Sequence, residues 1–74
     1  MINKILNNKY ELILKENLLH IKNYKEIIDI NSNNIIIKLN NKTLKIKGND
    51  LLICCLDEYE ILIKGDIKGL DFNE

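Results

Sequence analysis

Several short segments of this chain carry runs of consecutive apolar residues, and no other feature constrains the fold as strongly. They include Ile35 to Ile37, Leu51 to Ile53 and Ile61 to Ile63. Successive side chains of a β-strand point to opposite faces of the sheet, so each run places apolar groups on both faces. One sheet with one face in water cannot bury them all. We expect the sheet to fold over itself, or a partner to cover part of its second face.

The segments around these runs have the length and the boundaries of strands. Short Ile-rich runs are separated by Asn, Asp and Gly, which is typical of strands joined by tight turns. The predicted strands are Tyr10 to Lys15, Leu18 to Lys22, Lys25 to Ile30, Asn34 to Leu39, Thr43 to Lys47, Asp50 to Leu56, Tyr59 to Lys64 and Ile67 to Phe72. Alternation predicts that Leu44 and Ile46 share one buried face, and that Glu60 and Lys64 lie opposite Ile61 and Ile63.

Turn residues predict where the later strands end. Asn40-Asn41 can adopt the positive φ angles of a two-residue hairpin turn. Gly48-Asn49 and Gly65-Asp66 are predicted to break the following strands in the same way, because glycine tolerates positive φ. The predicted fold is therefore all-β, a small antiparallel meander folded into a sandwich or roll.

The length of 74 residues predicts one domain spanning residues 1–74, because so short a chain cannot form two cores. The first eight residues carry Ile2, Ile5 and Leu6 at helical spacing. They predict either a short helical turn that caps one side of the sheet or a frayed terminus.

Charge and hydropathy narrow the classes of function. Eleven Lys balance eleven acidic residues and there is no Arg, so the sequence gives little support for nucleic-acid binding. The longest apolar run, Leu51 to Leu56, is far shorter than the ~20 residues of a membrane-spanning helix. Since residues 1–8 do not resemble a secretory signal, we expect a cytoplasmic protein without direct membrane insertion.

The residue types that carry chemistry are sparse. Cys54 and Cys55 are adjacent and should point to opposite faces of a strand, so they neither chelate a metal together nor close an unstrained disulfide. His20 has no catalytic partner near it in the sequence, and we expect a surface or interface histidine. Ser32 lies in an Asn-rich turn without the surroundings of a nucleophile. We expect no catalytic residue, no metal site and no cofactor.

An acidic cluster formed by Asp57, Glu58 and Glu60 has two interpretations. Such carboxylates can bind Ca²⁺ or act as an acid and base pair. They also suit the polar tip of a hairpin, and we favour that interpretation.

The C-terminal half has a pattern of its own. A strand ending in Gly48 is followed by a polar pair ending in Asp50 and by a second apolar strand. The chain then ends in the pattern I-x-I-x-G-x-I-x-x-L-x-F, which is carried by Ile61, Ile63, Gly65, Ile67, Leu70 and Phe72. Over about residues 10–74 the chain resembles the YabP/YqfC family of sporulation proteins.

The resemblance implies a small non-enzymatic factor in endospore formation. Its YqfC-like branch implies a membrane-bound sporulation protein as partner, so that any membrane association would be made through that protein. The apolar residues expected at the interface are Ile36, Leu52 and Leu62, and self-association into a homo-oligomer is a further expectation. The alternative is a small barrel that binds single-stranded nucleic acid. The four aromatic residues, Tyr10, Tyr24, Tyr59 and Phe72, are scattered in the sequence and favour it little.

Overall fold

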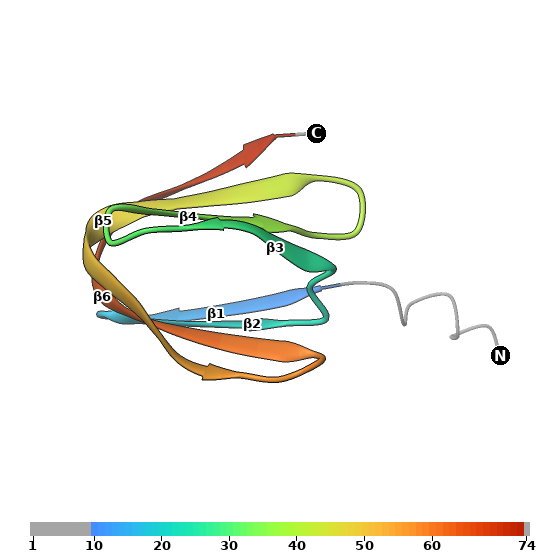
Figure 1. The fold of residues 1–74 in the computed structure, drawn as a ribbon, viewed down its shortest axis with the longest axis horizontal. Helices are drawn as coiled ribbons and strands as arrows, with labels where there is room; N and C mark the ends of the chain where they lie inside the picture. The colour runs from blue at the N-terminus through green and yellow to red at the C-terminus, as the bar shows by residue number, and fades with distance from the viewer. Residues whose placement is uncertain (1–9, 74) are drawn as a thin grey trace, which may run out of the picture.

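A computed structural model describes residues 10–73, which form one antiparallel sheet of six strands (Figure 1). The strands are β1 (Glu11–Lys15), β2 (Leu18–Lys22), β3 (Glu26–Ile30), β4 (Asn34–Lys38), β5 (Thr43–Leu56) and β6 (Glu60–Asn73). Their order in the sheet is β1-β2-β6-β5-β4-β3. The sheet is not closed, since no Cα atom of edge strand β1 lies within 8 Å of a Cα atom of edge strand β3.

The long hairpin of β5 and β6 bends in its middle and folds the sheet into two layers (Figure 1). The first layer contains β1, β2, the end of β5 and the start of β6. The second layer contains β3, β4, the start of β5 and the end of β6. The predicted all-β fold, an antiparallel sheet wrapped over itself, is confirmed. The hairpin of β1 and β2 pairs with β6, so the strands do not form one simple meander.

The predicted strand breaks at Gly48-Asn49 and Gly65-Asp66 are wrong. Both strands continue through these residues, and Gly48 pairs with Ile67 while Asn49 pairs with Asp66. The register shifts before Gly48 and again after Asn49, and Asp50 has a φ of 52°. Bulges of this kind bend a strand without ending it, so the glycines mark a corner of the sheet.

Two hairpin turns supply hydrogen-bond partners to this corner. The amides of Gly48 and Leu51 donate to the carbonyls of Asn33 and Ser32, at 3.0 and 2.9 Å. The amide of Gly65 donates to the carbonyl of Asn17 at 3.0 Å. Buried peptide groups need partners, and at the bend the ladder between β5 and β6 is interrupted. The turns before β2 and β4 therefore stabilise the bend.

The turn between β4 and β5 also differs from prediction. The hairpin is present, and the amide of Leu39 donates to the carbonyl of Lys42 at 2.8 Å. Neither Asn40 nor Asn41 has positive φ, so the turn is not of the mirror-image type I′ that was predicted from these two residues. The helical turn predicted for residues 1–8 lies outside the described residues.

The core lies between the two layers and contains only apolar side chains among the described residues. The predicted alternation is confirmed, since Leu44, Ile46, Ile61 and Ile63 are fully buried while Glu60 and Lys64 are exposed. The buried residues are Leu19, Ile21, Ile35, Ile37, Leu39, Leu44, Ile46, Leu51, Ile61 and Ile63.

The corner provides a test of the fold. A Cβ atom at Gly48 would overlap the carbonyl oxygen of Asp66, and one at Gly65 would lie 2.6 Å from the carbonyl oxygen of Asp50. Backbone atoms cannot move away cheaply, and Gly65 also has a φ of 143°. We expect Gly48→Ala and Gly65→Ala each to lower the free energy of unfolding by about 2 kcal/mol or more.

Gly69→Ala is the matched control, because a Cβ atom there meets nothing within 4 Å. We expect it to change the free energy of unfolding by less than about 1 kcal/mol. Urea denaturation of the three variants measures these values. A Gly48→Ala variant as stable as Gly69→Ala would contradict the close approach of the two strands.

Candidate functional site

The outward surface of the first layer carries a row of largely uncharged side chains across four strands. The register places Ile13 of β1 opposite His20 of β2, His20 opposite Leu62 of β6, and Leu62 opposite Cys55 of β5. Leu18 and Leu52 flank this row, each paired with Lys64. We call this surface the outer face and define it by Ile13, Leu18, His20, Leu52, Cys55 and Leu62.

The outer face leaves substantial apolar surface accessible. Leu52 is 61% exposed and Ile13 is 38% exposed, while Leu18 and Leu62 are half-buried. Charged residues border it on two sides. On one side the next row across the strands consists of Glu11, Lys22 and Glu60. On the other side Lys15 and Lys64 lie on either side of Leu18. An apolar centre with a charged border is typical of a protein-binding surface.

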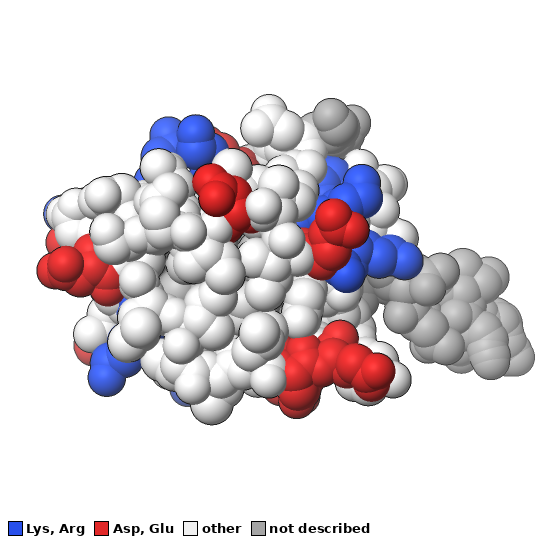
Figure 2. All heavy atoms as spheres, in the orientation of Figure 1, with Lys and Arg blue, Asp and Glu red and all other residues white. Residues whose placement is uncertain are grey.

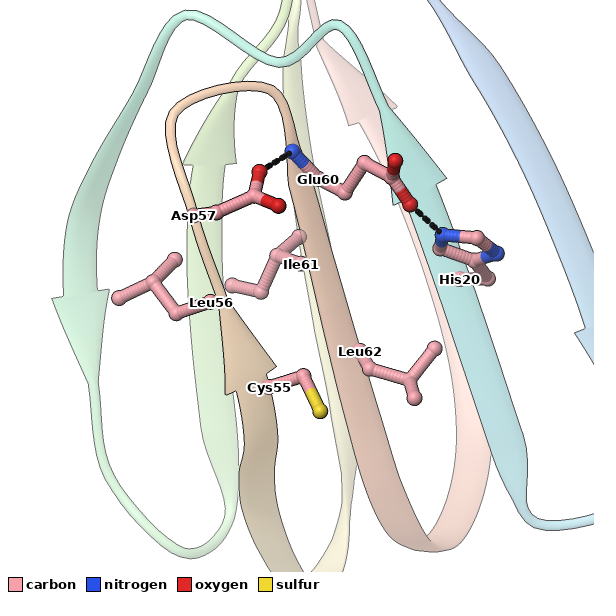
Figure 3. Close-up of a pocket in the computed structure, with 7 residues that line it drawn as sticks. All are labelled: His20, Cys55, Leu56, Asp57, Glu60, Ile61 and Leu62. Carbon is pink, nitrogen blue, oxygen red and sulfur yellow. Dashed lines mark hydrogen bonds and ion pairs between the residues drawn. The ribbon is translucent and has the colours of Figure 1, made fainter.

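Two shallow hollows lie on this face and share His20 and Leu62. One has a volume of about 160 Å³ and is lined by His20, Cys55, Leu56, Asp57, Glu60, Ile61 and Leu62 (Figure 3). The other has a volume of about 150 Å³ and extends toward β1, where Ile13, Lys15 and Leu18 complete its lining. Both are small beside the 300–1,000 Å³ usual for pockets that hold small molecules, and suit single side chains of a partner.

His20 has a partner that the sequence did not reveal. Its Nε2 lies 2.7 Å from Oε1 of Glu60 (Figure 3). The two residues are 40 positions apart, and the pairing of β2 with β6 makes them diagonal neighbours on the same face. The partner of His20 thus comes from a distant part of the sequence, where local reading could not find it.

The pair formed by His20 and Glu60 resembles two members of a nucleophile-activating triad, but the third member does not reach it. Cys55 is two strands away, on the far side of Leu62, which corresponds to about 10 Å between strand axes. The single Ser of the chain, Ser32, lies in the turn before β4, and the single Thr, Thr43, begins β5, so both belong to the second layer. The geometry suits a histidine held in one orientation.

Asp57 organises the turn between β5 and β6. Its Oδ1 accepts hydrogen bonds from the amides of Tyr59 and Glu60, both at 2.9 Å. These bonds, that of Tyr59 first, hold the pKa of the Asp57 carboxyl below its usual value, and the charge of His20 acts in the same direction. The hydroxyl of Tyr24 donates to the carbonyl of Asp57 at 2.7 Å. Asp57 thus serves the hairpin tip, as the favoured interpretation of the acidic cluster predicts.

The three residues predicted for an interface do not lie together. Leu52 and Leu62 share the outer face, but Ile36 lies on β4 in the second layer, where it pairs with Asp29 and Lys45. The sequence could not separate them, because all three look alike as middle members of apolar runs.

Cys54 and Cys55 are both free and exposed, and Cys54 lies where the register of β5 shifts.

A second cluster lies at the ends of β1, β5 and β6. The rings of Tyr10 and Phe72 stack with centroids 6.5 Å apart, and Nζ of Lys42 lies 5.7 Å from the centroid of Phe72. The aromatic residues are scattered in the sequence, but the fold of the sheet into two layers brings Tyr10 of the first layer against Phe72 of the second. An adjacent hollow of about 460 Å³ is lined by Tyr10, Lys42 and two asparagines.

Among residues 10–73, no group of three or more His, Cys, Asp or Glu side chains could hold a metal ion. The same residues include no helix with the length and apolarity needed to cross a bilayer.

Comparison with known families gives a match over nearly the whole chain. The model of the YabP family matches residues 7–74. The chain belongs to the YabP family. This confirms the resemblance seen in the sequence, and membership of the YabP family indicates a sporulation-related protein. No curated protein and no solved structure matches the chain.

The residues that carried the resemblance serve the fold of this YabP family member. Gly48, Asp50 and Gly65 form the corner of the sheet. The others lie along β6, with Ile61 and Ile63 fully buried, Ile67 and Leu70 packed against the core, and Phe72 stacked on Tyr10.

The turn at Asp57 provides a test by pH. Because folding lowers the pKa of the Asp57 carboxyl, ionised Asp57 stabilises the folded state at pH values above its unfolded pKa of 3.8. This stability is lost as the pH falls through the lower pKa of the folded state. We expect Asp57→Ala to lower the melting temperature at pH 7, and the difference from wild type to shrink below about pH 4.

Thermal unfolding followed by circular dichroism from pH 7 to pH 2 measures this difference. Glu58→Ala is the control, since the neighbouring Glu58 accepts neither of the two amide bonds. A difference between Asp57→Ala and wild type that stays constant with pH would show that the carboxylate does not act through its charge.

Proposed function

We propose that this protein is a non-enzymatic sporulation factor that acts as a protein-interaction or assembly module during endospore formation. The docking surface is the outer face of the first layer. The observation that carries the proposal is the row of largely uncharged side chains from Ile13 to Cys55, bordered by charges, in a member of the YabP family.

The energetics of the outer face favour a protein as its ligand. Covering an exposed Leu or Ile side chain contributes roughly 1.5–3 kcal/mol when burial is complete. Leu52 and Ile13 retain enough accessible surface to contribute part of this, and Leu62 and Leu18 extend the same area. The border of Lys and Glu side chains would then fix the orientation of the partner.

The partner we propose is a membrane-bound sporulation protein, as the YqfC-like branch of the family implies. The protein itself would act in the cytoplasm and reach the membrane through that partner. The apolar area and the two side-chain-sized hollows around His20 and Leu62 would receive an amphipathic segment of the partner on its cytoplasmic side.

Two observations support this proposal over the alternatives. The pair of His20 and Glu60 has no nucleophile within reach among the described residues, which favours binding over catalysis. The side of the molecule seen in Figure 2, which includes both layers, is uncharged over most of its centre, and the Lys side chains at its margins are interspersed with acidic ones. A surface that binds a strand of nucleic acid usually carries a continuous groove of basic side chains that contacts the phosphates.

Deletion of the gene in the native host tests the role. We expect the number of heat-resistant spores to fall at least tenfold, and to recover when the wild-type gene is restored. Leu52→Lys, at a strongly exposed position on the outer face, should fail to restore it, because the lysine places an unpaired charge in the interface.

Ile28→Lys is the matched control, since Ile28 is 51% exposed and lies on β3 in the second layer. It should restore sporulation as well as wild type. Affinity capture from sporulating cells with wild-type protein and with Leu52→Lys then identifies the partner. Unchanged spore counts after deletion would refute the sporulation role, and full rescue by Leu52→Lys would refute docking on the outer face.

A further inference from the structure

Strand β1 presents a free edge whose sequence is complementary to itself. Among the described strands β1 pairs only with β2, so its other edge has no strand beside it. The strand reads Glu-Leu-Ile-Leu-Lys from Glu11 to Lys15. When two copies run antiparallel with Ile13 opposite Ile13, Glu11 of each copy faces Lys15 of the other, and Leu12 faces Leu14.

We propose that two copies of this chain associate through β1, edge to edge and antiparallel, around a two-fold axis at Ile13. The partner is a second copy of the same chain, and the proposal does not depend on the proposed sporulation role. The first layers of the two copies then form one continuous sheet.

The backbone geometry favours the same register. The two-residue turn Glu16-Asn17 is closed by Lys15 and Leu18, and such a closing pair is hydrogen-bonded. Hydrogen-bonded and non-bonded pairs alternate along an antiparallel ladder, so the peptide groups of Leu12 and Leu14 point toward the free edge. These are the two residues that face each other when Ile13 lies on the axis.

Neighbouring registers lose the charge match. Moving the axis to Leu12 sets Glu11 opposite Ile13, and moving it to Leu14 sets Lys15 opposite Ile13. In both registers the peptide groups of Leu12 and Leu14 still point toward the second copy, but neither register sets Glu11 opposite Lys15. Only the register centred on Ile13 pairs opposite charges at both ends of the strand.

The apolar side chains of β1 are partly exposed, so a second copy could bury more of their surface. Leu14 pairs with the buried Leu19 and therefore points toward the inside of the sheet, yet it is 51% exposed, because β1 is the last strand of its layer. In the dimer Leu14 lies against Leu12 of the second copy. Ile13, on the outward surface, lies against its own counterpart.

The other free edge does not have these properties. The register of β3 shifts between Ile27 and Asp29, and a bulge at an edge discourages the addition of a strand. Antiparallel self-pairing of β3 around Ile28 would set Glu26 opposite Ile30, and Asp29 opposite Ile27. The sequence and geometry of β3 thus disfavour the contact that β1 favours.

Sedimentation velocity of the full chain over a range of concentrations tests the dimer. Glu11 and Lys15 are exposed, so charge reversal should leave the fold intact, which circular dichroism verifies. Glu11→Lys or Lys15→Glu alone replaces two attractive pairs by two repulsive ones and should raise the dimer dissociation constant about tenfold or more. The double variant should restore the wild-type dissociation constant, and an equimolar mixture of the two single variants should form a heterodimer.

Cross-linking fixes the position of the axis. Residues opposite each other in a non-hydrogen-bonded antiparallel pair have Cα atoms about 4.5 Å apart, within the range of a disulfide. Ile13→Cys, with Cys54 and Cys55 changed to Ser, should therefore form a covalent dimer on oxidation. Ile28→Cys in the same background, on the edge of β3, should not.

Three results would overturn the proposal. The first is a monomer at every concentration. The second is a dimer whose dissociation constant does not change when the charge of Glu11 or Lys15 is reversed. The third is a dimer abolished by Leu52→Lys, which would place the contact on the outer face. Because Leu52→Lys should leave the β1 dimer unchanged, loss of sporulation and loss of self-association are separable.

Discussion

The close approach of two backbones at the corner of the sheet determines the rest of this structure. A side chain at Gly48 would overlap the backbone of Asp66, and one at Gly65 would collide with that of Asp50, so glycine at both positions allows β5 and β6 to approach this closely. Bending this hairpin brings its own two halves into different layers. The side chains between those layers then form a core in a sheet whose edges never meet.

The outer face is a consequence of the same geometry. Alternation sends every second side chain of β2, β5 and β6 to the core, and the remaining ones must lie on the outward surface. In the first layer those remaining side chains form an uncharged centre that includes Leu, Ile and Cys and is bordered by Lys and Glu. In the second layer β5 places Lys45 and Lys47 on the outward surface, with Ile36 beside Lys45 on β4. The two layers thus share one core but present different chemistry outward, and only the first resembles a binding surface.

Local signals predicted much of this fold, and nonlocal pairing accounts for what they missed. Leu18–Lys22 was predicted with the bounds that the structure has, because alternation and flanking polar residues are local. A glycine before a polar residue looks the same whether the chain reverses or merely bends, so Gly48 and Gly65 were assigned to turns. The meeting of His20 with Glu60 depends on β2 pairing with β6, a choice that no short stretch of sequence encodes.

The bonds from the hairpin turns to the corner affect how the molecule opens. The amide of Gly65 depends on the turn before β2, and those of Gly48 and Leu51 depend on the turn before β4. If either hairpin detached, peptide groups in the middle of β5 or β6 would lose their partners and the other layer would loosen with them. Amide hydrogens in both layers should therefore exchange with solvent through one shared cooperative opening, with no separate subglobal unfolding of either half.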